Sequence, residues 1–426
     1  MKRGIIHLCK IGILFENRDF EHDVYELIKA FYPEAEIHTL YENAEAEYDL
    51  RFSVEQDNDS YIIKYERTEN LSKQETEQKG VISADILSKE NAGCGIQDAH
   101  ALRKENKDNI KYALYQLLVK LTGRTLPWGN LTGIRPAKLA MGMIESGMKN
   151  TEAAREMRER YLVSPQKTAL AITIANRERE ILKDIDYENG YSLYIGIPFC
   201  PSICLYCSFS SYPLKVWEKR TDEYVEALCR EVRETALMMK GRKLDTIYIG
   251  GGTPTTLLPH QIRKLLDTVG EAFGYEGLAE FTVEAGRPDS ITREKLEVLR
   301  KWGITRISIN PQTMQQRTLD LIGRRHSVEQ TVESFKIARE LGFDDINMDL
   351  IMGLPEESLE DVRDTLEQIM QLKPDNLTVH SLALKRAARL NMFKEDYKDY
   401  KMVNTQEHMD LTASYAKKMD LFPYYL

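Results

Sequence analysis

From Leu193 onward the chain alternates short β-rich runs with longer amphipathic segments. This alternation is typical of repeated βα units around a parallel sheet. Gly303 and Gly342 stand where intervening helices are expected to end. Six such units form either an open doubly wound sheet or an incomplete (βα) barrel, and periodicity does not choose between these α/β folds. The six strands are predicted at Leu193–Ile197, Thr246–Ile249, Glu280–Glu284, Arg306–Asn310, Ile346–Met352 and Leu377–Leu382.

Both folds place functional residues in the loops that follow the carboxyl ends of the strands. In each of the first five units, residues that are unusual for a plain βα repeat lie at or near the carboxyl end of the strand. We therefore expect a functional site at this edge of the sheet. Its candidate residues, in strand order, are the cysteines Cys200, Cys204 and Cys207, then Gly250–Pro254, then Glu284, then Gln312, and then Asp349.

The three cysteines have the spacing C-x3-C-x2-C. Three thiolates can hold a [4Fe-4S] cluster and leave the fourth iron open, whereas an electron-carrying cluster normally has four cysteines. An open iron can chelate the amino and carboxylate groups of a methionine moiety, which indicates S-adenosylmethionine as a second cofactor. One electron would then release a carbon radical from the sulfonium, with the hard chemistry residing in the cofactor. Buried structural cysteines and a zinc site are the alternatives, but no second close ligand pair follows.

The glycines of Gly250–Pro254 allow close approach of a ligand to the backbone. A plain tight turn is the alternative, but the cysteines one loop away favour the ligand. The spacing is neither a dinucleotide fingerprint nor a P-loop. Glu284 and Asp349 lie in apolar strands, where an unpaired charge is costly, so each is expected to have a partner. Gln312 and Arg324 add an amide and a cation that suit a carboxylate. Taken singly, each of these residues is also consistent with a structural ion pair or hydrogen bond.

Composition limits the other classes of function. A hydrophobic content of 42% with 29% charged residues is ordinary for a globular protein, and no stretch approaches the roughly 20 apolar residues of a membrane span. The amino terminus does not resemble a secretory signal, and the unpaired cysteines indicate a cytoplasmic protein. A net charge of -9 argues against a general nucleic-acid binder.

With 426 residues, the chain is expected to hold more than one domain. Residues 1–185 are predicted to form a smaller α/β domain, 186–385 the βα core, and 386–426 the start of a C-terminal region. The apolar end of the chain favours a truncated fragment. The N-terminal domain is predicted to contain a helix at Phe20–Phe31, a hairpin of Tyr48–Gln56 with Tyr61–Arg67, helices up to Asp184, and a solvated loop or surface helix at Ser72–Lys79.

Several strings together resemble the oxygen-independent coproporphyrinogen III oxidase family of radical S-adenosylmethionine enzymes. The similarity spans about residues 190–426, and the extension containing Pro127–Pro136 resembles the branch called coproporphyrinogen dehydrogenase of the HemZ type. The strings are Tyr194–Ser210, Ile249–Pro254, Arg306–Gln312, Gly323–His326 and Asn347–Pro355.

This resemblance implies a partial (βα)6 TIM-like radical SAM barrel with a [4Fe-4S] cluster on Cys200, Cys204 and Cys207. The implied activity is oxidative decarboxylation of coproporphyrinogen III, with a porphyrinogen as substrate, an electron donor such as flavodoxin or ferredoxin, and a one-electron acceptor. Catalytic residues beyond the cofactor contacts are not implied. The implied contacts to S-adenosylmethionine are Tyr194, Tyr206, Gly251, Gly252, Thr253, Glu284, Gln312, Arg324, Asp349 and, more weakly, Ala383.

Two positions depart from the better-known oxidases, which carry histidine where Gly196 stands and a fourth cysteine where Phe209 stands. Members of the haem-chaperone type also lack that fourth cysteine, and they bind and deliver haem. A haem-modifying or methyl-transferring radical enzyme is the third possibility. The N-terminal extension favours the dehydrogenase branch.

Overall fold

The computed structural model describes residues 9–41, 47–57, 60–71, 74–85, 99–133 and 135–425. The chain forms two compact units, one of residues 1–182 with 423–426 and one of residues 183–422. Each unit buries a hydrophobic core of its own. Among the described residues, no helix is both long enough and apolar enough to cross a membrane.

The N-terminal unit is built on a five-stranded sheet with the order β2-β1-β3-β4-β5. β1 is parallel to β2 and β3, whereas β3, β4 and β5 are antiparallel, so the predicted hairpin and the predicted first helix are confirmed. The turn residues Asn58 and Asp59 lie outside the described residues. The elements are β1 Lys10–Phe15, α1 Glu21–Phe31, β2 Glu36–Leu40, β3 Leu50–Asp57, β4 Ser60–Leu71, β5 Gln74–Asp85, α2 Ala99–Thr122, α3 Pro136–Glu145, α4 Asn150–Glu159 and α5 Pro165–Ile181.

The prediction of a loop or surface helix at Ser72–Lys79 is wrong for the described residues. Gln74–Lys79 is the first half of β5, which pairs with β4 over the whole length from Leu71↔Gln74 to Ser60↔Asp85. Ser72 and Lys73 lie outside the described residues. A run of charges resembles a solvated segment in composition, but strand formation depends on the neighbouring strand, which composition does not report.

The C-terminal unit is built on a six-stranded sheet with the order β13-β12-β11-β10-β9-β6, and every pair is parallel. All six strands predicted from the sequence are therefore present and adjacent in chain order. The strands are β6 Gly190–Ile197, β9 Lys243–Gly251, β10 Glu280–Gly286, β11 Arg306–Ile309, β12 Ile346–Met352 and β13 Asn376–Ser381, with a two-stranded ladder of β7 Phe199–Cys200 and β8 Tyr212–Pro213.

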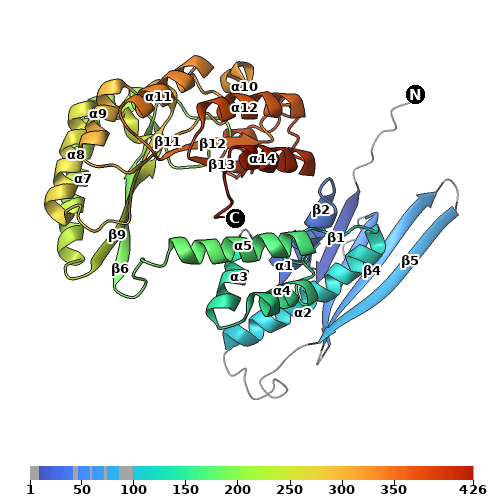
Figure 1. Ribbon diagram of the computed structural model, residues 1–426. Helices are drawn as coiled ribbons and strands as arrows, with labels where there is room; N and C mark the ends of the chain where they lie inside the picture. Colours follow the sequence, from blue (N-terminus) through green and yellow to red (C-terminus); the bar gives the residue numbers. More distant parts are fainter. Residues whose placement is uncertain are drawn as a thin grey trace. The chain divides into compact units, whose positions relative to one another are not determined.

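The strand order decides between the two architectures left open by the sequence. A doubly wound sheet reverses its order at a switch point, whereas here the order follows the chain without reversal. Successive right-handed crossovers then place the helices on one face, and the sheet curls around the other. In Figure 1, α7, α8, α9 and α11 lie along one side of the strands. β6 and β13 are the edges of the described sheet, so the fold is a partial (βα)6 barrel without closure.

The helices of this unit bury one face against the sheet. In α8, for example, Ile262, Leu265 and Val269 enter the core, and α14 contributes Tyr415 to the same core. Gly303 and Gly342 follow α9 and α11 with positive φ values of 73° and 84°, which confirms both predicted helix ends. The helices are α6 Leu214–Trp217, α7 Thr221–Met238, α8 Pro259–Phe273, α9 Arg293–Lys301, α10 Gln316–Leu321, α11 Val328–Glu340, α12 Leu359–Leu372, α13 Arg389–Met392 and α14 Gln406–Lys418.

Candidate functional site

The three predicted cysteines share one loop at the carboxyl end of β6. Cys200 ends β7 and pairs with Pro213 of β8, and the backbone N–H of Cys207 donates to the carbonyl of Cys204 over 3.2 Å. All three are free thiols, of which Cys200 and Cys204 are buried. Burial raises the pKa of Cys200 and of Cys207, and the neighbouring cysteines raise both further. Three thiolates gathered here would repel one another, so the loop suits a cationic group bound to all three.

The cysteine loop offers three free thiols. A structural zinc site normally has four protein ligands, whereas three thiolates can hold a [4Fe-4S] cluster and leave one iron open. Among the described residues, no group of three or more His, Cys, Asp or Glu side chains is arranged to hold a single metal ion.

The glycine loop after β9 packs directly against the cysteine loop. A Cβ atom at Gly252 would lie 2.8 Å from the carbonyl oxygen of Phe199 and 3.0 Å from Cys200 Sγ. Gly251 has φ of 110°, and a Cβ atom there would lie 3.0 Å from the carbonyl oxygen of Ile197. Thr253 is buried with its hydroxyl 3.6 Å from Cys200 Sγ. Part of the requirement for glycine is thus the close approach of the chain to itself.

Two predicted residues from different strands meet through a tyrosine that the sequence analysis did not single out. The ring of Tyr248 in β9 stacks on that of Tyr194 in β6, with centroids 5.7 Å apart. The Tyr248 hydroxyl donates to the Glu284 carboxylate in β10. Burial raises the pKa of Glu284, and the charge of Asp349 raises it further, while the bond from Tyr248 opposes both. Tyr248 alternates with the buried Ile247 and Ile249, a signal that could have placed it on the Glu284 face.

Gln312, just after β11, lies beside Asp349 in the middle of β12. The backbone N–H of Gln312 donates to the carbonyl of Asp349 over 2.9 Å, and Gln312 has a positive φ of 69°. The side-chain oxygen Oε1 of Gln312 is buried without a hydrogen-bond partner. Asp349 Oδ1 accepts from Asn347 Nδ2 over 2.7 Å. A buried acceptor without a donor is costly unless something else binds it, so Oε1 is suited to a ligand N–H or O–H group.

Two of the three guanidinium nitrogens of Arg324 donate hydrogen bonds to other groups of the protein. It is buried, its Nη1 donates to the Tyr206 hydroxyl over 2.9 Å, and its Nη2 donates to the carbonyl of Asn310. Only Nε lacks a partner. Arg324 therefore holds Tyr206, which lies within the cysteine loop between Cys204 and Cys207. Ala383 lies in the segment after β13 and is exposed, and its predicted contact stays a prediction.

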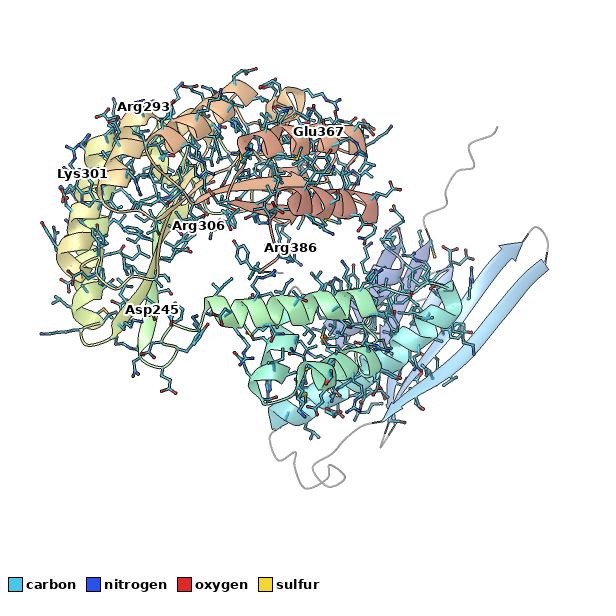
Figure 2. All side chains as sticks on the ribbon, viewed as in Figure 1. Asp245, Arg293, Lys301, Arg306, Glu367 and Arg386 are labelled. Carbon is cyan, nitrogen blue, oxygen red and sulfur yellow. The ribbon has the colours of Figure 1, made fainter. Side chains whose placement is uncertain are left out.

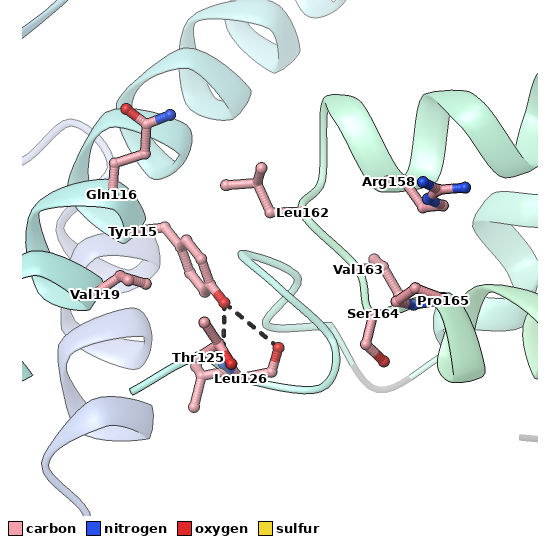
Figure 3. Close-up of a pocket in the computed structure, with 10 residues that line it drawn as sticks. All are labelled: Tyr115, Gln116, Val119, Thr125, Leu126, Arg158, Leu162, Val163, Ser164 and Pro165. Atoms are coloured by element: carbon pink, nitrogen blue, oxygen red, sulfur yellow. Dashed lines mark hydrogen bonds between the residues drawn. The ribbon is translucent and has the colours of Figure 1, made fainter. Parts of the chain in front are cut away.

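Two cavities of the described part of the chain are relevant to the position of the site. One of about 730 Å³ adjoins the cysteine loop and is lined in part by Phe199, Tyr212 and Trp217. The other, of about 480 Å³, lies in the N-terminal unit (Figure 3). There the Tyr115 hydroxyl accepts from the N–H of Leu126 over 2.9 Å, and none of the predicted site residues lines this cavity.

Comparisons with known proteins identify several similar sequences. A model described as the Radical SAM superfamily matches residues 194–369. A protein of Bacillus subtilis named oxygen-independent coproporphyrinogen-III oxidase-like protein HemZ is 37% identical over 372 residues, which are 84% of this chain and 73% of that protein. The heme chaperone HemW of Bacillus subtilis is 39% identical over 45% of this chain and 50% of its own length.

The oxygen-independent coproporphyrinogen III oxidase of Escherichia coli is 32% identical over 53% of this chain and 48% of its own length. The chain thus spans about half the length of the matched chaperone and oxidase. The solved structure of the Escherichia coli coproporphyrinogen III oxidase HemN is 29% identical, with a TM-score of 0.49 over 57% of this chain and 55% of that one.

Proposed function

Because this chain belongs to the radical SAM family of oxygen-independent coproporphyrinogen III oxidase-like proteins, we propose that it catalyses the oxidative decarboxylation of coproporphyrinogen III to protoporphyrinogen IX. The cofactors of this family are a [4Fe-4S] cluster and S-adenosylmethionine. The observation that carries the proposed reaction is the likeness to the HemZ protein, which extends over 84% of this chain and therefore includes residues of the N-terminal unit.

In this proposal Cys200, Cys204 and Cys207 hold the cluster. When bound, the two cofactors supply a carbon radical that removes a hydrogen atom from a substrate carbon. The unpaired Oε1 of Gln312 accepts from a ligand N–H group, and the half-buried Glu284 carboxyl faces the ligand beside Tyr248. The residues proposed to contact S-adenosylmethionine are Tyr194, Tyr206, Gly251, Gly252, Thr253, Glu284, Gln312, Arg324, Asp349 and Ala383.

The proposed substrate sets further requirements. Each reacting propionate loses one hydrogen atom and carbon dioxide and becomes a vinyl group, which leaves one electron for an acceptor. A separate electron donor, such as flavodoxin or ferredoxin, reduces the cluster. The substrate carboxylates need cations, and we propose Arg386 (Figure 2), which is exposed after β13, as one of them.

The direct test is anaerobic turnover. The protein is purified without air, and its iron and sulfide are measured. It is then incubated with a reductant, S-adenosylmethionine and coproporphyrinogen III. We expect 5′-deoxyadenosine and protoporphyrinogen IX together from the wild type, and neither from Cys204→Ser. Cys9→Ser is the matched control, because Cys9 is a free, partly buried thiol of the N-terminal unit, and it should behave as the wild type. Formation of 5′-deoxyadenosine without any porphyrin product would contradict the proposed substrate.

Haem delivery is the second candidate. It is favoured by the 39% identity to the heme chaperone HemW and by Gly196 and Phe209, which replace the histidine and the fourth cysteine expected of an oxidase. A Cβ atom at Gly196 would meet only Tyr194, at 3.5 Å, so the glycine is not required by packing. Stoichiometric haem uptake and transfer to an acceptor protein, with no porphyrinogen turnover, would select this function.

A further inference from the structure

A buried arginine lies beneath the cysteine loop. Arg287 follows β10 and is only 3% exposed. Its Nη1 donates to the carbonyl of Ser202 over 2.9 Å and to the hydroxyl of Ser202 over 2.7 Å. The same Nη1 lies 4.0 Å from Cys204 Sγ. The guanidinium group thus contacts both the backbone and a sulfur of the loop that carries Cys200, Cys204 and Cys207.

The rest of the guanidinium group is held by one carboxylate. Arg287 Nε donates to Asp289 Oδ1 over 3.0 Å, and Nη2 donates to Asp289 Oδ2 over 2.6 Å. This bidentate pair fixes the orientation of the arginine. Because Asp289 occupies only the Nε and Nη2 side, the Nη1 side keeps its positive end toward Cys204. The pair is neutral as a whole but acts on the sulfur as an oriented dipole.

The contacts continue into a second loop. The Ser202 hydroxyl donates to the carbonyl of Gly323 over 2.7 Å, and the next residue, Arg324, donates to Tyr206. The cysteine loop is therefore held from two sides by buried guanidinium groups. Arg287 binds it between Cys200 and Cys204, and Arg324 binds it between Cys204 and Cys207.

We propose that Arg287 is a positioning residue for the [4Fe-4S] cluster, which holds the cysteine loop through Ser202 and raises the reduction potential of the cluster through Nη1. This inference rests on the proposed binding of the cluster by the three cysteines. Donors and positive charge near a cluster sulfur stabilise the more negative reduced state, and few water molecules reach a buried group to screen that effect. The cluster must be reduced before the sulfonium is cleaved. The contact with Arg287 would therefore affect how low the reduction potential of the electron donor must be.

A purely structural ion pair is the competing explanation, because buried Arg–Asp pairs occur without any functional role. The two explanations predict different changes in the reduction potential of the cluster for two substitutions. Arg287→Gln removes the positive end, whereas Asp289→Asn removes the negative end and leaves the positive charge uncovered. An electrostatic role moves the reduction potential down in Arg287→Gln and up in Asp289→Asn. A structural role loosens the loop in both.

The experiment compares the full-length wild type, Arg287→Gln, Arg287→Lys and Asp289→Asn after anaerobic reconstitution. Midpoint potentials are measured by redox titration followed by electron paramagnetic resonance, and cluster retention is measured as the rate of iron loss to a chelator. Arg293→Gln is the control, since Arg293 lies on the outer side of α9 (Figure 2) and pairs with Glu340 at the surface.

We expect Arg287→Gln to lose iron about 10-fold faster, as with other partners of metal ligands, and to titrate at a lower potential. Arg287→Lys keeps the charge and should titrate closer to the wild type. Asp289→Asn should titrate above the wild type, and Arg293→Gln should match it. Shifts of the same sign in Arg287→Gln and Asp289→Asn, or no shift in any variant, would overturn the inference.

The substitutions also separate this inference from the proposed function. If the wild type binds no cluster on the three cysteines, the proposed function itself fails before any variant is compared. If the wild type binds the cluster and Arg287→Gln, Arg287→Lys and Asp289→Asn all have the same midpoint potential as the wild type, only the role of Arg287 fails. If Arg287→Gln holds no cluster at all, Arg287→Lys and Asp289→Asn still test the role of Arg287. Arg287→Lys is expected to titrate close to the wild type, and Asp289→Asn above it.

Discussion

Glu357 is a buried glutamate whose carboxyl group accepts a hydrogen bond from Thr313. Burial raises its pKa from 4.5 to about 7. Because the pKa is higher in the folded protein, the protonated form is the one that folding favours. This contribution to stability is complete below pH 4.5 and is lost as the pH rises through about 7.

We therefore predict that Glu357→Gln, which cannot ionise, is more stable than the wild type at pH 8 by up to about 3 kcal/mol, since one pKa unit corresponds to about 1.4 kcal/mol. At pH 4.5 the two proteins should unfold at nearly the same denaturant concentration. Glu360→Gln serves as the control, because Glu360 is exposed on α12 beside Arg363. A stability difference that stays constant between pH 4.5 and pH 8 would show that Glu357 does not ionise within this range.

The glycine loop, which lies between β9 and α8, packs against the cysteine loop. A methyl group at Gly252 would press on the Phe199 carbonyl at 2.8 Å and on Cys200 Sγ at 3.0 Å, so β7 must shift in Gly252→Ala. Overpacking of this kind costs about 1–3 kcal/mol. We predict lower thermal stability of the C-terminal unit and less iron per chain after reconstitution.

Gly142 in α3 supplies the matched control for this prediction. Nothing lies within 4 Å of a Cβ atom there, and the position is exposed. Gly142→Ala should raise the stability of the N-terminal unit by about 0.5–1 kcal/mol. The reason is that the unfolded chain has less conformational freedom with alanine than with glycine, so less entropy is lost when the helix forms. Equal iron content in Gly252→Ala and Gly142→Ala would indicate that the glycine loop does not position the cysteines.

The inner strand β12 could be predicted because both of its faces are buried, so Ile346–Met352 reads as a mostly apolar run. β5 could not be predicted, because its pairing with β4 is not visible in a charged sequence. The predicted residues Cys200, Gly252 and Thr253 do meet, since parallel strands bring their carboxyl ends to one edge.

Arg287 shows why part of the site could not be predicted. An arginine between Gly286 and Pro288 resembles a solvated turn residue, because arginine is rarely buried unless it is paired. Its burial depends on Asp289 nearby and on Ser202, which is 85 positions away along the chain. Alternation with Ile247 and Ile249 could have placed Tyr248 on the Glu284 face, but its hydrogen bond to Glu284 on the next strand could not be predicted. Contacts between loops of different strands require the three-dimensional arrangement.

The division of the chain into two units leads to a prediction about where the cofactors are held. Every residue proposed to bind the cluster or S-adenosylmethionine lies between Tyr194 and Ala383, within the unit of residues 183–422. That unit has a core of its own, formed by the sheet and by helices from α7 to α14. α5 ends at Ile181 and β6 begins at Gly190, and Tyr187 between them is 73% exposed.

We predict that mild proteolysis of the reconstituted protein cuts within residues 183–189 and that the iron remains with the C-terminal fragment, which should still cleave S-adenosylmethionine under reduction. Exposed connecting segments are cut before packed elements, because the protease needs an extended backbone. Mass spectrometry identifies the cut, and iron analysis after separation under native conditions identifies the fragment that holds the cluster. Iron in the N-terminal fragment, or iron released as soon as the chain is cut, would mean that the C-terminal unit does not hold the cluster alone. Retained cleavage of S-adenosylmethionine with lost porphyrinogen turnover would instead assign the N-terminal unit to the substrate, since the radical would then form without reaching its target.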